Sequence, residues 1–259
     1  MHKEQDCLKF REGKFVATTH EVIKEEPLSI SINGRHFVTA MISPQMKKEF
    51  VIGHLFSEGV IKSSKEIESL QLGDDTANVI VAHPLKAVAA RKIILTGCGT
   101  GSSFLDDSKL PKIHATMTVG VEDILSGVKS LLDHSELHRI TGGVHVVGLF
   151  ERYAQGYVAV SMVEDVGRHN ALDKVIGYGL TRGIAFEKTF IVSTGRISSE
   201  MALKCAVANI PVIASRGATT SLAIEVAVKT GLCIIGFVRG DKMNVYTNPE
   251  RIVTKGEES

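Results

Sequence analysis

The last third of the chain alternates between short apolar runs and helical patterns, and this alternation constrains the fold more than any other feature. Residues 188–192, 211–214 and 232–238 are typical of buried strands, while 197–209 and 221–229 have the apolar spacing of helices. A strand–helix–strand order at this spacing favours parallel pairing with right-handed crossover connections. We therefore predict an α/β fold built on a parallel sheet.

An arginine and a glycine occur directly after or at the end of each of these strands. The segments are Ser193-Thr194-Gly195-Arg196, Ser215-Arg216-Gly217-Ala218-Thr219-Thr220 and Arg239-Gly240-Asp241-Lys242. Ligands bind at the carboxyl ends of strands in open parallel sheets. Guanidinium groups pair with phosphate oxygens, and helix N-termini favour anions. Arg196, Arg216 and Arg239 thus predict a phosphate-bearing ligand, with ordinary turns and solvated arginines as the alternative. The sequence lacks the Rossmann and P-loop glycine signatures, so neither of those folds is predicted.

The first third is typical of a small β-rich α+β unit. Asn33-Gly34 is a strong hairpin turn between predicted strands at 27–32 and 35–42. A helix is expected at 45–58, followed by strands at 68–72, 78–82 and 90–95, and a glycine- and serine-rich loop covers 97–110. We place a domain boundary near Pro111, which separates a smaller domain (1–110) from a larger α/β domain (111–259). In the larger domain, 119–133 predicts an amphipathic helix, and 144–150 with 157–164 predicts an antiparallel hairpin that extends the sheet.

Charge and hydropathy exclude several classes of protein. The 30 Lys and Arg residues balance 29 Asp and Glu residues, and the chain has no Trp, which argues against a strongly basic or stacking nucleic-acid binder. The charged N-terminus and the lack of an 18-residue apolar run argue against a signal peptide and a membrane span. The four cysteines lack Cys-x-x-Cys spacing, so no zinc pair is expected. We expect a cytoplasmic protein with reduced thiols, of which Cys205 and Cys233 are buried.

Cys98 is the thiol whose surroundings suggest chemistry. It follows a predicted strand within Thr96-Gly97-Cys98-Gly99-Thr100-Gly101, where three glycines give the backbone freedom to move. A cysteine in such a loop can alternate between two partners, and backbone N–H groups or a nearby cation could stabilise its thiolate. The alternative is a cysteine that is merely tolerated in a surface loop.

A second polar segment precedes the helix predicted at 171–180. Asp165, His169 and Asp173 are spaced by four, so they could bind a metal if the helix began early enough. Gly167 argues against that early start. The favoured interpretation is that Asp165 or Asn170 caps the helix and that His169 forms a local hydrogen bond. His145 lies in a predicted strand and is interpreted as an inward-facing, hydrogen-bonded histidine.

Long motifs in the chain resemble the formate dehydrogenase accessory sulfurtransferase (FdhD) family. The resemblance runs from about residue 28 to residue 251 and is most specific in EDVGRHNALDKVIG and GFVRGDKMNVYT. Further matching stretches are SINGRHFVTAMISP, IGHLFSEGVI, TGCGTGSS, TGGVH, STGRISSEM and KCAVANIPVIASRGATTSLAIEVA.

The resemblance implies a cytoplasmic sulfur carrier. Such proteins accept sulfur from a cysteine desulfurase as a cysteine persulfide and pass it to molybdenum bis(molybdopterin guanine dinucleotide) before that cofactor enters formate dehydrogenase. The persulfide cysteine maps to Cys98. The cofactor-contacting segment maps to Phe237, Val238, Arg239, Gly240, Asp241 and Lys242. Together with Arg196 and Arg216, this segment is expected to bind GDP as a fragment of the cofactor.

The resemblance also implies a fold and an assembly. The larger domain is expected to be a three-layer α/β domain similar to cytidine deaminases, with a smaller β-rich domain before it, in a homodimer. The deaminase zinc signature is missing from this sequence, so we expect the fold without the metal. Many family members have a second loop cysteine where this chain has Gly101, which puts any mechanism that needs two loop cysteines in doubt. A nucleotide-binding regulatory module and a thiol redox protein are the alternatives to sulfur transfer.

Overall fold

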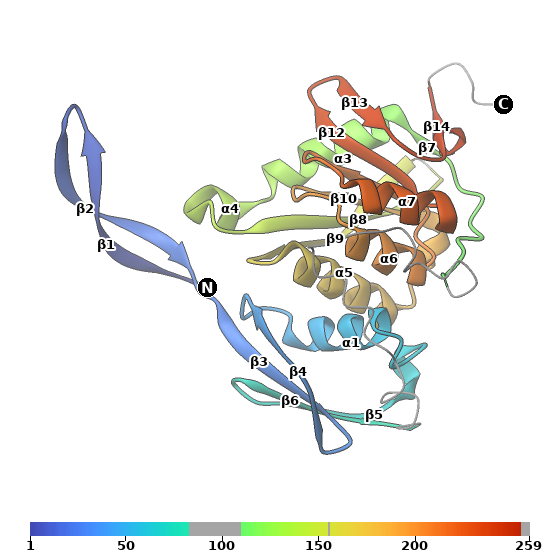
Figure 1. The fold of residues 1–259 in the computed structure, drawn as a ribbon, viewed down its shortest axis with the longest axis horizontal. Helices are drawn as coiled ribbons and strands as arrows, with labels where there is room; N and C mark the ends of the chain where they lie inside the picture. The colour runs from blue at the N-terminus through green and yellow to red at the C-terminus, as the bar shows by residue number, and fades with distance from the viewer. Residues whose placement is uncertain (83–109, 155, 255–259) are drawn as a thin grey trace.

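The computed structural model describes residues 1–82, 110–154 and 156–254 and contains a central six-stranded sheet (Figure 1). Its strand order is β13-β12-β11-β10-β8-β9. The strands are β8 (His145–Tyr153), β9 (Gly156–Asp165), β10 (Thr189–Ser193), β11 (Val212–Ser215), β12 (Cys233–Arg239) and β13 (Lys242–Val245). The β10–β11 and β11–β12 pairs are parallel, while the β8–β9 hairpin joins β10 in antiparallel fashion. The predicted parallel strands and their antiparallel extension are both confirmed.

Helices cover both faces of this sheet, because apolar side chains alternate along its buried strands. Ile213 and Ile234 belong to the core shared with α5 (Arg168–Arg182), α6 (Ser199–Val207) and α7 (Ser221–Thr230). Val212 and Cys233 belong to the opposite core, which includes residues of α3 (Val121–Asp133). The result is the predicted arrangement of three layers, helix, sheet and helices (Figure 1). Its likeness to cytidine deaminases stays a prediction.

The smaller unit packs a helix on a four-stranded sheet of order β4-β3-β6-β5. The strands are β3 (Glu26–Ile32), β4 (Arg35–Ile42), β5 (Ile67–Leu72) and β6 (Thr76–Val81), and the helix is α1 (Lys47–Ser57). Asn33 and Gly34 form the predicted turn with φ values of 48° and 78°, which asparagine and glycine tolerate best. The strand predicted at 90–95 lies outside the described residues, and the domain boundary near residue 110 stays a prediction.

The two units meet where α1 crosses α5, at a pair of glycines. A β-carbon on Gly53 would lie 1.8 Å from the carbonyl oxygen of Asp173, and one on Gly177 would lie 1.9 Å from that of Glu49. Neither position has room for any side chain, so the two helix backbones approach each other directly. This close crossing fixes the smaller unit against the helical face of the large sheet.

The N-terminal 23 residues form a feature that the sequence analysis did not predict. Strands β1 (His2–Arg11) and β2 (Lys14–Ile23) pair as an antiparallel ribbon that projects from the body (Figure 1). Nearly all of its residues are exposed, including Phe10 and Phe15, which contact each other edge to face at its tip. The sequence did not reveal these strands, because exposed strands lack the apolar alternation that marks a half-buried sheet.

Short elements complete the described chain. They are α4 (Glu136–Thr141), the parallel pair β7 (Val119–Gly120) and β14 (Ile252–Val253), and the 3₁₀ turns η1 (Ser64–Glu66), η4 (Phe186–Lys188) and η5 (Pro249–Arg251). No helix within the described ranges is both long enough and apolar enough to cross a membrane.

Candidate functional site

The loops that follow β10 and β11 have the same internal hydrogen bonds. The hydroxyl of Ser193 accepts from the N–H of Gly195 at 3.1 Å, and that of Ser215 accepts from the N–H of Gly217 at 2.9 Å. Ser215 also donates to the carbonyl of Gly195 at 2.6 Å, which joins the two loops. Several backbone groups at these strand ends are therefore satisfied internally. Recognition of a ligand falls mainly to the side chains that the loops present.

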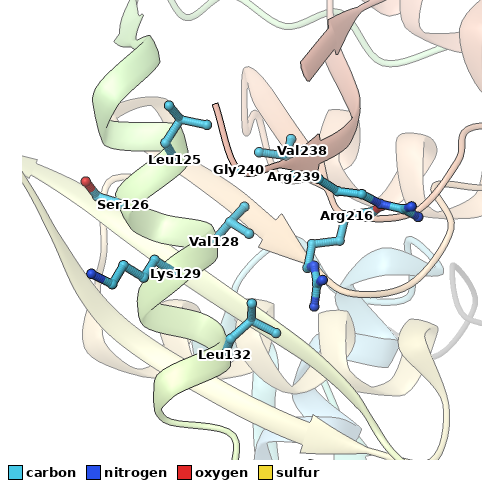
Figure 2. Close-up of a pocket in the computed structure, with 9 residues that line it drawn as sticks. All are labelled: Leu125, Ser126, Val128, Lys129, Leu132, Arg216, Val238, Arg239 and Gly240. Atoms are coloured by element: carbon cyan, nitrogen blue, oxygen red, sulfur yellow. The ribbon is translucent and has the colours of Figure 1, made fainter. Parts of the chain in front are cut away.

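Arg216 and Arg239 border one pocket at the ends of β11 and β12. The pocket has a volume of about 400 Å³ and lies between these strand ends and α3 (Figure 2). Arg239 Nε donates to the carbonyl of Arg216 at 3.3 Å, and Phe237 N donates to the carbonyl of Gly217 at 2.9 Å. The apolar lining comes from Leu125, Val128, Leu132 and Val238, and the remaining lining residues are Ser126, Lys129 and Gly240. The pocket combines an apolar wall with the side chains of Arg216 and Arg239, whereas the Lys129 side chain points away from both arginines (Figure 2).

The segment 237–242 has an irregular backbone where it borders this pocket. The β12–β13 register shifts between Gly236 and Arg239, and Phe237 adopts a φ of 54°, which is unusual for an aromatic residue. Val238, Arg239 and Gly240 line the pocket. Phe237, Asp241 and Lys242 are exposed and do not line it. Strained backbone of this kind is concentrated at functional sites, because the surrounding fold must hold it in place.

Arg196 does not line the pocket and instead lies near Arg168 and His145. A β-carbon on Gly195 would lie 2.9 Å from Cβ of Arg168 and 3.1 Å from Nδ1 of His145, so this glycine lets both residues pack against the β10 loop. Burial, followed by the charge of Arg196, lowers the pKa of Arg168. Burial, followed by the charge of Arg168, lowers the pKa of His145. His145 is half-buried, and its ring has no hydrogen bond to the described residues, which differs from the prediction for it.

His169 lies beside this group and is held neutral near physiological pH. Its Nε2 shares a hydrogen bond of 2.8 Å with Ser198 Oγ, which also accepts from Met201 N as the cap of α6. Burial, helped by the charges of Arg168 and Lys204, lowers the pKa of His169 to about 4. The local hydrogen bond predicted for His169 is wrong, because its partner lies 29 residues away in sequence.

The two aspartates considered as metal ligands are paired with buried lysines instead. Asp165 Oδ2 lies 2.5 Å from Lys174 Nζ, and both oxygens of Asp173 lie 2.7 Å from Lys204 Nζ. Helix α5 begins at Arg168, three residues before the predicted start at 171, and Asp165 lies outside it, as Gly167 indicated. The prediction that Asp165 or Asn170 caps the helix is wrong, because the N-cap is Gly167 and no side chain caps it. Asp165 accepts from the N–H of Gly167 and thus fixes the turn before the helix. No group of three potential metal ligands occurs among the residues that the structure describes.

These ion pairs also join the two units of the fold. Lys174 donates to the carbonyl of Ser43, and Ser43 N donates to Asp165. Asp173 lies 3.0 Å from His54 Nδ1 and accepts from Ser57 Oγ, both of which belong to α1. The smaller unit is therefore bound to the N-terminal half of α5, beside the strand-end loops.

The predicted reactive thiol, Cys98, and its loop lie outside the described residues. Cys205 and Cys233 are fully buried, as predicted, and burial raises the pKa of each to about 12. Both thiols are therefore unreactive at physiological pH. Cys7 is exposed on β1.

Several residues of the candidate site were missed from the sequence. Arg168 belongs to the motif EDVGRHNALDKVIG, in which the spacing of Asp165, His169 and Asp173 suggested metal ligands instead. Lys129 comes from the solvent-facing side of an ordinary amphipathic helix, and nothing in the local sequence distinguishes it. Only the packing of α3 across the strand ends makes Lys129 a lining residue of the pocket that contains Arg216 and Arg239.

Comparisons with known proteins assign this chain to a family. The model of the FdhD/NarQ family matches residues 23–253. The chain belongs to the FdhD/NarQ family. A protein of Bacillus pumilus named sulfur carrier protein FdhD is 37% identical over 96% of this chain and 97% of its own length. The Bacillus subtilis protein of the same name is 35% identical over 96% of each chain.

A solved structure extends this relationship to the fold. The crystal structure of a protein from Desulfotalea psychrophila, described as a formate dehydrogenase accessory protein, is 29% identical and has a TM-score of 0.80. It covers 97% of this chain and 99% of its own. The FdhD/NarQ resemblance predicted from the sequence motifs is therefore confirmed.

Proposed function

We propose that this chain is a sulfur carrier that serves formate dehydrogenase. The observation that carries the proposal is its 35–37% identity, along nearly the whole chain, to FdhD/NarQ proteins that are named sulfur carriers. The Desulfotalea psychrophila neighbour, described as a formate dehydrogenase accessory protein, supports the same partner.

Cys98 carries the sulfur in this proposal. Its thiolate attacks the terminal sulfur of a persulfide on a cysteine desulfurase. A new S–S bond forms on Cys98, the desulfurase S–S bond breaks, and the desulfurase cysteine leaves as a thiolate, so no external oxidant is required. The burial of Cys205 and Cys233 supports this choice, because neither can present a thiolate to a partner. This chain has Gly101 where many family members have a second loop cysteine, and the lack of that thiol disfavours the thiol redox alternative.

The acceptor is molybdenum bis(molybdopterin guanine dinucleotide), which binds as a substrate at the strand ends. The Arg216–Arg239 pocket suits a nucleotide fragment such as GDP. Its volume of about 400 Å³ is within the usual range for ligand sites, and its apolar wall and cationic rim match a base and a diphosphate. The deaminase-like fold would place sulfur transfer at the carboxyl edge of the sheet, where this pocket opens.

The protein works in the cytoplasm as a homodimer in this proposal, between the desulfurase and formate dehydrogenase. A nucleotide-binding regulatory module is the competing function, since the pocket by itself requires no sulfur chemistry. The two functions differ in what happens to Cys98.

The deciding experiment is mass spectrometry after incubation with a cysteine desulfurase and cysteine. We expect the peptide that contains Cys98 to gain about 32 Da, the mass of one sulfur. Cys98→Ser should abolish this gain and the maturation of formate dehydrogenase, while Cys7→Ser, the exposed-cysteine control, should retain both. A Cys98→Ser protein that still supports full maturation would show that this residue carries no sulfur, and unchanged GDP binding by that variant would then favour the regulatory module.

A further inference from the structure

A second cationic group lies at the end of β10, apart from the Arg216–Arg239 pocket. We call it the α5 cluster, and it consists of Arg168, Arg196, His145 and the N-terminus of α5. Arg168 and His145 both pack against Gly195, and the charge of Arg196 acts on each of them. None of these residues lines the pocket that contains Arg216 and Arg239.

The start of α5 differs from the starts of the two neighbouring helices. Ser198 caps α6 and Thr220 caps α7 through their side chains. Helix α5 has no side-chain cap at Gly167 and no acidic residue in its first turn. Its 15 residues give it a full helix dipole, so its first N–H groups favour an anion.

Arg168 supplies an independent observation. Its Nε is buried and has no hydrogen-bond partner among the described residues, although buried polar atoms are almost always paired. The nearby carboxylates do not supply one. Asp165 is bonded to Lys174, and Glu200 lies 3.7 Å from His169 and forms no ion pair with Arg168 within the described chain. An Nε kept without a partner in this way can pair with an external acceptor once the side chain rotates.

We propose that the α5 cluster binds a phosphate or pyrophosphate group as a second anion subsite. Rotation of the Arg168 side chain lets Nε and a terminal nitrogen bind one anion together, while Arg196 and the α5 N-terminus contact its other oxygens. The natural ligand that we infer depends on the proposed function, but the binding of inorganic phosphate does not.

The position of the cluster indicates what kind of ligand uses both sites. A β-carbon on Gly217 would lie 3.2 Å from Arg196 N, so the loop that carries Arg196 touches the loop that carries Arg216. A ligand with two separate phosphate-bearing ends can place one end in the pocket and the other at the α5 cluster.

The test is an NMR titration that observes arginine Nε–Hε groups while inorganic phosphate is added. We expect the Arg168 signal, assigned by its loss in Arg168→Lys, to shift saturably. Sodium chloride at equal ionic strength should not reproduce the shift, because it only screens charge. Calorimetry should show phosphate binding weakened about tenfold or more at this site in Arg168→Gln. Arg182→Gln, at the other end of α5, is the matched control and should bind as the wild type does.

Three results separate this proposal from its rivals. An Arg168 shift that chloride reproduces, an Arg168 shift that Arg216→Gln removes, or calorimetric phosphate binding that Arg168→Gln leaves unchanged overturns the α5 cluster as a site. If Arg168→Gln fails to fold, Arg196→Gln decides the question with the same criteria, because Arg196 is exposed and its replacement leaves the core intact. Persulfide loading of Cys98 is measured separately, so failure of this subsite and failure of sulfur transfer are distinguishable.

Discussion

Replacement of Lys204 by methionine tests how much the buried Asp173–Lys204 pair, which links α5 to α6, stabilises the fold. Asp173 is 1% exposed, and both of its oxygens accept from Lys204 at 2.7 Å. Methionine keeps most of the side-chain volume but removes the charge. Among the residues that the structure describes, the buried carboxylate then keeps only Ser57 and His54 as partners. Breaking a buried ion pair from one side costs about 3–5 kcal/mol. That is a large part of a total stability of about 5–15 kcal/mol.

Urea denaturation followed by circular dichroism measures this cost. With a slope of about 3 kcal/mol per molar urea, the midpoint should fall by about 1–2 M. The double variant Asp173→Leu with Lys204→Met should recover most of the loss, because it leaves no unpaired charge. Lys65→Met is the exposed control and should change stability by less than about 0.5 kcal/mol. A loss below about 1 kcal/mol in Lys204→Met would refute this account of the pair.

The pH dependence of the stability loss in Lys204→Met provides an independent check on the role of the Asp173–Lys204 pair. Burial by itself raises the pKa of Asp173, but Lys204 and His54 outweigh it and lower the pKa from 3.8 to about 2. In the wild type, the stabilising contribution is therefore complete above pH 3.8 and is lost as the pH falls toward 2. In Lys204→Met, burial raises the pKa of Asp173 without opposition from the lysine, so the loss of stability should shrink as the pH is lowered from neutral toward 4. A loss that does not change with pH would exclude the unpaired carboxylate as its cause.

Three further predictions concern the ligand pocket, the helix crossing and the ribbon. Arg239→Ala should weaken GDP binding about tenfold or more in calorimetry, because a charge-assisted hydrogen bond contributes about 1.5–3 kcal/mol; equal affinity would remove Arg239 from the site. Gly177→Ala should destabilise the fold by at least about 1–3 kcal/mol in urea, since α1 and α5 must separate. Gly127→Ala is the helical control, where the new β-carbon meets only side chains at 3.2–3.5 Å, and an equal loss there would contradict the role of the crossing. Deletion of residues 3–22 should change the free energy of unfolding by less than about 1 kcal/mol, because the ribbon is almost wholly exposed; a larger loss would show that the ribbon supports the body.

The sequence by itself determined the layered α/β core, because strand and helix periodicities differ and each is set by local geometry. The parallel order of β10, β11 and β12, the turn at Asn33-Gly34 and the burial of Cys205 and Cys233 all follow from such local patterns. The family was also fixed at this level, through motifs whose residues are contiguous in the chain.

Only the tertiary structure decided which charged residues meet. Lys204 pairs with Asp173 across 31 positions, and Arg196 lies with Arg168 rather than with Arg216 and Arg239. The ribbon and the glycine crossing could not be predicted from the sequence either. An exposed strand has no buried face to give an apolar pattern, and the residues around a helical glycine do not indicate which other helix it contacts. Contacts between distant segments depend on how whole elements pack, and no local pattern specifies which side chains that packing brings into the same site.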